Sequence, residues 1–171
     1  MRAVDFVPFD YRKCSHRKTL RGLLSGYFDE TFVNHPEDRP PARFLPKLLK
    51  MIAAETAKYL QWLYLCRLDG RFIGFCCFQL DTLGAPLCKR EGWGFIIREL
   101  YSVPAERRKG YAARMCAFAE QILRRHDPTG IYLTADPHNG VPFWQAMGYV
   151  PAGYADDGNG QQVFEKYFKR A

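Results

Sequence analysis

The sequence lacks the long apolar runs and the repeated segments that would place it in a membrane or in a repeat protein. No apolar run approaches the roughly 20 residues that a membrane-spanning helix needs, and no internal repeat or low-complexity tract is present. Residues 1–10 alternate as a strand does and contain no apolar leader core. We therefore expect a cytoplasmic protein that does not bind a membrane.

Spacing typical of a metal site is also missing. The six cysteines and four histidines show none of it, so no metal cofactor is expected. Most of the cysteines lie in apolar stretches, where free cysteine behaves as a small buried hydrophobic residue. Cys76 and Cys77 would point to opposite faces of a strand, which opposes a disulfide between them. Free thiols agree with a reducing compartment.

The charge is basic, with 25 Lys and Arg residues against 18 Asp and Glu residues and a formal net charge of +7. Most of the excess is scattered along the chain, as on solvated helix faces, and no recognisable nucleic-acid-binding module accompanies it. We therefore expect no nucleic-acid partner, although a basic nucleic-acid-binding module is kept as an alternative. The length of 171 residues and the hydrophobic content of 47% suit one domain with one sizeable core.

Hydrophobic periodicity predicts interleaved strands and helices, which is the pattern of an α/β protein. Alternating or apolar runs predict strands over residues 4–9, 63–68, 72–80, 93–103, 131–135, 149–154 and 161–168. Helical spacing predicts helices over residues 13–30, 110–126 and 141–147, and another that ends before Trp62. Asp69 and Gly70 form a favoured hairpin pair between two of the strands.

The junction between the long strand and the helix that follows it is the most informative part of the sequence. The strand ends at Pro104, and the helix opens close to Gly110. A helix start leaves backbone N–H groups without partners and carries a partial positive charge, so it favours an anion. Gly110 and Ala112 are small enough for a bulky anion to approach the main chain. The cationic run Arg107 to Lys109 adds charge there, so we predict an anion cradle.

This junction resembles the central signature of the Gcn5-related N-acetyltransferase (GNAT) superfamily. Pro104, Arg107 and Gly110 have the spacing of its P-x-x-R-x-x-G core, with Ala112 in place of the last glycine. A second match follows at Pro142, Phe143, Trp144, Met147, Gly148 and Tyr149. The resemblance implies one acyl-CoA N-acyltransferase domain over residues 1–171. Its central sheet is mixed but mostly antiparallel, with helices on both faces and a splayed strand pair that binds the cofactor.

The resemblance also implies acetyl-CoA as the acyl donor. The diphosphate would rest on the backbone N–H groups of residues 108–112, aided by cationic side chains, and residues 100–102 would pair with the pantetheine arm. A backbone N–H near Tyr101 or Ser102 would polarise the thioester. The implied cofactor-binding residues are Leu100, Tyr101, Ser102, Val103, Arg107, Arg108, Lys109, Gly110, Tyr111, Ala112, Asn139, Phe143 and Trp144.

The catalytic groups are less clear from the sequence. A primary amine must lose a proton, directly or through water, before it attacks, and a carboxylate near the thioester would help. Glu99 is the first candidate because it precedes the cofactor-pairing residues and shares a face with Tyr101 by strand alternation. An ion-paired surface glutamate is the alternative. Many relatives have a tyrosine acid where Trp144 stands. Tyr149 or Tyr101 could replace that acid, or Trp144 could serve packing alone.

The expected reaction is transfer of an acetyl group to a primary amine of a small molecule or a peptide, by direct attack in a ternary complex. In this superfamily the acceptor usually meets the first two helices and the final hairpin. Acidic residues there, such as Asp29, Glu30 and Asp156, would suit a cationic amine. A non-catalytic acyl-CoA sensor of the same fold is the alternative, and a homodimer stays open.

Overall fold

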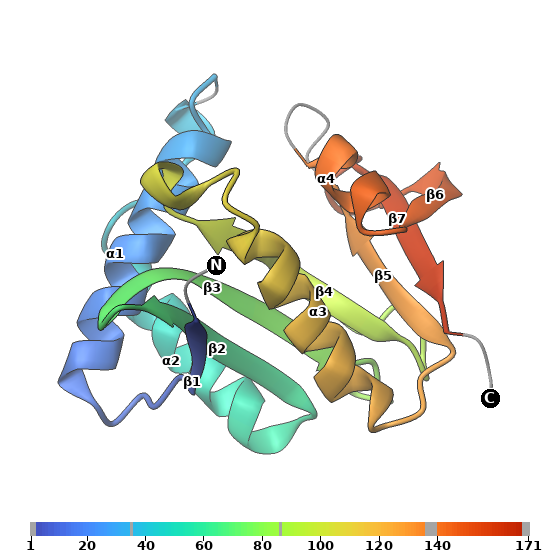
Figure 1. The fold of residues 1–171 in the computed structure, drawn as a ribbon, viewed down its shortest axis with the longest axis horizontal. Helices are drawn as coiled ribbons and strands as arrows, with labels where there is room; N and C mark the ends of the chain where they lie inside the picture. Colours follow the sequence, from blue (N-terminus) through green and yellow to red (C-terminus); the bar gives the residue numbers. More distant parts are fainter. Residues whose placement is uncertain (1–2, 35, 86, 136–139, 169–171) are drawn as a thin grey trace.

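The computed structural model describes residues 3–34, 36–85, 87–135 and 140–168. Strands and helices alternate along these residues (Figure 1). The strands are β1 (Val4–Pro8), β2 (Gln61–Leu68), β3 (Arg71–Leu80), β4 (Gly94–Ser102), β5 (Gly130–Thr134), β6 (Val150–Ala155) and β7 (Gln162–Tyr167). The helices are α1 (Cys14–Thr31), α2 (Phe44–Lys58), α3 (Tyr111–Arg124) and α4 (Val141–Ala146), with short 3₁₀ turns η1 (Pro36–Asp38) and η2 (Pro104–Glu106).

The described strands form one seven-stranded sheet in the order β1-β2-β3-β4-β5-β7-β6. Neighbouring strands are antiparallel except β4 and β5, which run parallel. In the described residues these two strands pair at two positions, Gly94 with Ile131 and Phe95 with Tyr132. Figure 1 shows them diverging beyond that point. The predicted fold class, including the splayed strand pair, is confirmed.

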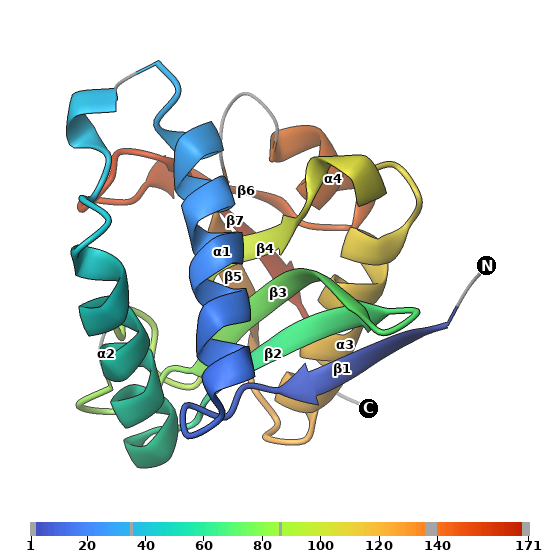
Figure 2. The same cartoon turned by 90° about the vertical axis from the view of Figure 1, so that its left-hand side faces the viewer.

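Helices cover both faces of the sheet, and each face has its own core (Figure 2). Helices α1 and α2 pack on one face around residues such as Leu20, Leu48 and Cys77. Helices α3 and α4 pack on the other face, around residues that include Cys76 and Met115. The adjacent cysteines therefore lie in opposite cores, as the alternation predicts. No described helix is both long and apolar enough to cross a membrane.

A bulge interrupts β4 in the middle of the sheet. Cys76 of β3 lies opposite Leu100, but the next residue, Cys77, lies opposite Ile97. Two residues of β4, Arg98 and Glu99, therefore have no counterpart on β3. A bulge of this kind bends the strand and changes the direction in which its backbone groups point. It lies between the first residues of β4, which pair with both β3 and β5, and the last residues, which pair with β3.

Candidate functional site

The last residues of β4 present free backbone groups on the side where β5 diverges. Val103 N–H donates to Ile73 O at 2.9 Å, which turns the backbone of Val103 toward β3. In an antiparallel ladder this orientation alternates, so Tyr101 also faces β3 while Leu100 and Ser102 face away from it. The backbone N–H and C=O groups of Leu100 and the N–H group of Ser102 can therefore pair with an extended ligand that lies along the free edge of β4, while the Ser102 carbonyl accepts a hydrogen bond from Arg107 Nε at 3.0 Å.

The start of α3 provides unpaired backbone donors at the end of this edge. Gly110 caps the helix with φ of 80°, and Arg108 also has a positive φ of 62°. The first hydrogen bond of the helix runs from Arg114 N–H to Gly110 O at 3.2 Å. Within the described part of the chain, the N–H groups of residues 108–113 donate to no acceptor. This is the geometry of a cradle for a phosphate group.

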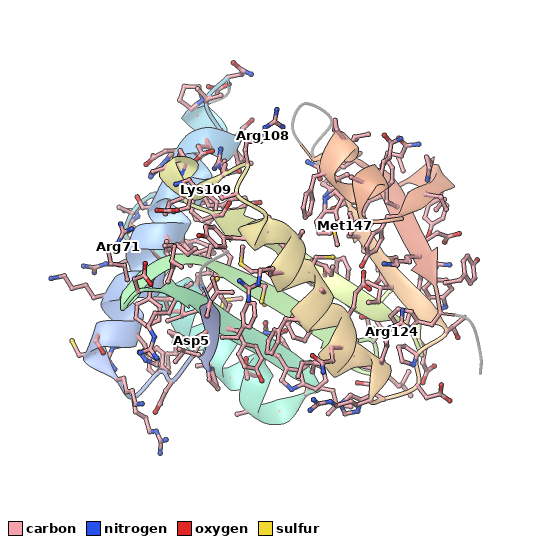
Figure 3. The ribbon with its side chains drawn as sticks, viewed as in Figure 1. Asp5, Arg71, Arg108, Lys109, Arg124 and Met147 are labelled. Carbon is pink, nitrogen blue, oxygen red and sulfur yellow. The ribbon has the colours of Figure 1, made fainter. Side chains whose placement is uncertain are left out.

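The three cations beside the cradle have different surroundings. Arg107 Nη2 donates to Glu30 Oε2 at 2.6 Å, and Lys109 Nζ lies 3.0 Å from Glu106 Oε2. The hydrogen bond from Lys109 holds the pKa of Glu106 below its usual value. Arg108 is exposed and has no ion-pair partner among the described residues. In Figure 3 its side chain extends from the start of α3 toward the side on which α4 lies. Of these three side chains, Arg108 is thus the one left for an anion.

Tyr101 belongs to the opposite face of the sheet, beside α1. Its side chain is buried, and its hydroxyl donates to Glu30 Oε1 at 3.1 Å. Burial, together with the nearby Glu30 carboxylate, raises the pKa of Tyr101 to about 12. The hydroxyl therefore stays protonated at neutral pH, and it already has an acceptor within the protein.

The aromatic residues of the second motif form part of the core between α3 and α4. Trp144 is 3% exposed and packs edge-to-face against both Phe143 and Tyr149. The Tyr149 side chain is 1% exposed, and its hydroxyl donates to Glu120 Oε1 at 3.2 Å. Burial raises the pKa of Tyr149 well above its ordinary value. This structural partner disfavours Tyr149 as the acid of the reaction, and the burial of Trp144 agrees with a packing role.

Two of the predicted site residues, Glu99 and Asn139, are described only in part or not at all. Glu99 lies in the bulge of β4, where the simple alternation that would give it the face of Tyr101 is interrupted. The Glu99 side chain and the whole of Asn139 lie outside the described residues. The role of each remains a prediction.

The acidic residues expected to attract a cationic amine are paired within the chain. Asp29 lies 2.7 Å from Arg39, Glu30 binds Arg107, and Asp156 binds Lys89. The hydrogen bond from Lys89 lowers the pKa of Asp156. The charges of these three carboxylates are therefore balanced by cations of the chain itself.

Sequence reasoning missed the part that Glu30 plays, because its partners are 71 and 77 residues away along the chain. No local spacing carries that information. The pair of Glu106 and Lys109 was open to prediction, since residues three apart face each other on a helical turn. The strand alternation also favours Leu100 and Ser102 over Tyr101 as the residues whose backbone faces the ligand.

Residues 21–149 match the sequence profile described as "Acetyltransferase (GNAT) family". The chain belongs to this acetyltransferase family. The matched segment contains the free edge of β4, the cradle at the start of α3 and the aromatic residues of α4. No curated protein sequence matches the chain.

Solved structures of GNAT proteins share the fold of this chain. The PaiA N-acetyltransferase of Thermoplasma acidophilum in complex with coenzyme A is 16% identical, with a TM-score of 0.71 over 97% of this chain and 99% of that one. An aminoglycoside 6′-N-acetyltransferase complexed with coenzyme A is 13% identical, with a TM-score of 0.68 over 99% of both chains. A GNAT acetyltransferase of Brucella melitensis in complex with acetyl-CoA is 14% identical, with a TM-score of 0.62 over 99% of this chain and 91% of that one.

Proposed function

We propose that this GNAT protein transfers an acetyl group from acetyl-CoA to a primary amine, by direct attack in a ternary complex. The observation that carries the proposal is the row of unpaired N–H groups at residues 108–113, which continues the free edge of β4. A long thioester ligand with a diphosphate fits such an arrangement. The coenzyme A complexes of the PaiA and aminoglycoside acetyltransferases, which share the fold, support the same ligand class.

The chain's own groups divide the work of holding the ligand. Backbone N–H groups of residues 108–112 would bind the diphosphate, and the Arg108 guanidinium would add a charge-assisted contact. Leu100 and Ser102 would hydrogen-bond the pantetheine amides, as a neighbouring strand does. One of their N–H groups would also polarise the thioester carbonyl, where a comparable donor in other enzymes contributes about 3 kcal/mol.

The reaction also requires that the amine lose a proton and that the thiol of coenzyme A leave. An alkyl amine has a pKa of about 10.4, so a base or a water must remove its proton before attack. Glu99 is our candidate for that base because it lies in β4 directly before Leu100. The leaving thiol has a pKa of about 8.5, so it can depart as thiolate without a dedicated acid. The buried Trp144 and the engaged hydroxyl of Tyr149 are compatible with such a mechanism.

The state of Trp144 and Tyr149 also favours a second candidate function, that of a non-catalytic sensor of acyl-CoA. Trp144 cannot act as a proton donor to a thiolate, and the Tyr149 hydroxyl serves Glu120. A sensor needs the cradle and the free strand edge but no acid or base. Both candidates bind acetyl-CoA, so turnover separates them.

The acceptor is a small-molecule or peptide amine in this proposal. We also propose a cytoplasmic location, in line with the six free cysteines. A homodimer is compatible with it, and no nucleic-acid partner is required.

The deciding experiment is a screen for acetyl-CoA-dependent release of free thiol across polyamines, aminoglycosides, amino acids and peptides. We expect calorimetric binding of acetyl-CoA and turnover with one class of amine. Binding without turnover across the panel would favour the sensor. Salt-sensitive binding to DNA or RNA without competition by acetyl-CoA would instead support the basic nucleic-acid-binding module.

A further inference from the structure

Glu30, near the end of α1, binds two residues that were predicted to belong to the cofactor site, Tyr101 and Arg107. Its Oε1 accepts a hydrogen bond from the Tyr101 hydroxyl at 3.1 Å, and its Oε2 accepts one from Arg107 Nη2 at 2.6 Å. Tyr101 belongs to β4, and Arg107 leads into the cradle. One carboxylate thus connects a helix on one face of the sheet to both halves of the predicted acetyl-CoA site.

Arg107 passes this connection on to the free edge of β4. Its Nε donates to Ser102 O at 3.0 Å, and its guanidinium carbon lies 5.7 Å from the centre of the Tyr101 ring. Nε and Nη2 thus bind partners from different segments of the chain, which fixes the plane of the guanidinium. The backbone of Ser102 and the start of the cradle are therefore held by a side chain whose own position depends on Glu30.

The packing around Tyr101 leaves α1 little freedom to shift. A Cβ atom at Gly26 would lie 2.8 Å from the Tyr101 hydroxyl oxygen, so a larger residue there would displace that hydroxyl. The ring of Tyr27 also packs edge-to-face against Tyr101, with ring centres 5.9 Å apart. The hydroxyl of Tyr101 is thus directed to Glu30 by contacts with the same helix.

We propose that Glu30 is a positioning residue for acetyl-CoA, which acts through Arg107 on Ser102 and on the cradle. The inference rests on the proposed function, because it concerns the affinity of the same site. It gives Arg107 a structural role, although the resemblance to the family had implied that Arg107 binds the cofactor. Glu30 touches neither the thioester nor the diphosphate in this proposal.

The sign of the effect distinguishes positioning from simple charge. Glu30 is a negative charge near a site for an anion, so removal of that charge alone should tighten the binding of acetyl-CoA. A positioning role predicts the opposite, because loss of the ion pair releases Arg107 and loosens the Ser102 edge.

The test compares Glu30→Gln with Glu55→Gln by calorimetric titration with acetyl-CoA. Glutamine keeps an acceptor for Tyr101 but loses the charge that holds Arg107. Glu55 lies on α2, and its side chain has no partner among the described residues. We expect Glu30→Gln to weaken binding about threefold to fivefold, since the pair is partly exposed, and Glu55→Gln to leave the affinity unchanged. Equal or tighter binding by Glu30→Gln would overturn the proposal.

A double-mutant cycle tests the route through Arg107. Arg107→Gln should weaken binding at least as much as Glu30→Gln, and the double variant should bind no more weakly than Arg107→Gln alone. Additive losses would show that Glu30 acts by another route and would contradict the proposal. With an amine that is acetylated, Glu30→Gln should raise KM for acetyl-CoA while kcat stays within about twofold. If the wild-type protein itself does not bind acetyl-CoA, the proposed function fails instead.

Discussion

At the scale of single residues, the cationic run before α3 shows how neighbours in the sequence acquire different roles. Arg107 is held by Glu30 and by the carbonyl of Ser102, and Lys109 is held by Glu106 and by the carbonyl of Ala105. Arg108 has a left-handed backbone and an exposed side chain. A positive φ turns a side chain away from the course of its neighbours. The odd conformation of Arg108 therefore explains why it alone is available to an anion.

The first prediction concerns Arg108→Asn. Asparagine removes the charge but tolerates a positive φ, so the loop should keep its shape. We expect the affinity for acetyl-CoA to fall about threefold to tenfold, and the loss to shrink as salt is added. Arg125→Gln, at the far end of the same helix, removes the same charge and should leave the affinity unchanged. Calorimetric titrations at low and high salt measure both variants, and equal affinities for wild type and Arg108→Asn would exclude a contact with the ligand.

The sequence predicted the position of this cationic run but not the partners of Arg107. The ion pair of Arg107 with Glu30 and the hydrogen bond of Tyr101 to Glu30 both join residues far apart in the chain, so no periodicity encodes them. The position of the Glu99 side chain could not be predicted from the sequence for a similar reason. Its predicted face rests on alternation along β4, and the bulge at Arg98 and Glu99 arises from the register with β3, which single-strand patterns do not contain.

At the scale of elements, the junction of β4 and α3 was predictable because each element has a clear local signal. The helix was expected to open close to Gly110, and Gly110 is its N-terminal cap. Apolar residues at helical spacing in α3, among them Met115 and Leu123, are buried. The start of α2 is less well marked, since it begins at Phe44 while its clearest apolar spacing begins at Leu48. The start of α2 has no capping side chain, so the sequence contains no capping signal that would mark it.

The second prediction concerns Gly110→Glu. The new side chain would place a carboxylate at the cradle and force a non-glycine residue to a φ of 80°. We expect no measurable binding of acetyl-CoA. Gly84→Glu is the matched control, because Gly84 has a φ of 81° and open space around it in the loop between β3 and β4. The control carries the same charge and the same backbone strain, so it should bind as the wild type does. Retained affinity in Gly110→Glu would move the diphosphate site elsewhere.

At the scale of the whole molecule, the diverging strands β4 and β5 need a connection that keeps their two sides in place. Helix α3 packs against β3 and β4, and α4 lies on the side of β5 and β7 (Figure 1). Glu120 of α3 binds Lys166 of β7 at 2.8 Å, and Lys166 also donates to the carbonyl of Met147, directly after α4. Tyr149 donates to the same carboxylate. This cluster therefore joins α3 to β7 and to the end of α4.

The last prediction concerns Glu120→Gln, which keeps an acceptor for Tyr149 but leaves the ammonium of Lys166 without its counter-charge. Glu120 is 11% exposed at its side chain and Lys166 is 24% exposed, so part of the lost attraction is recovered from water. We expect the free energy of unfolding to fall by about 2 kcal/mol, measured as a lower urea midpoint with an unchanged slope. The double variant with Lys166→Met should regain part of that loss, because it no longer buries an unpaired charge. A double variant less stable than Glu120→Gln would show that the hydrogen bond from Lys166 to Met147, and not the charge pair, holds the two sides together.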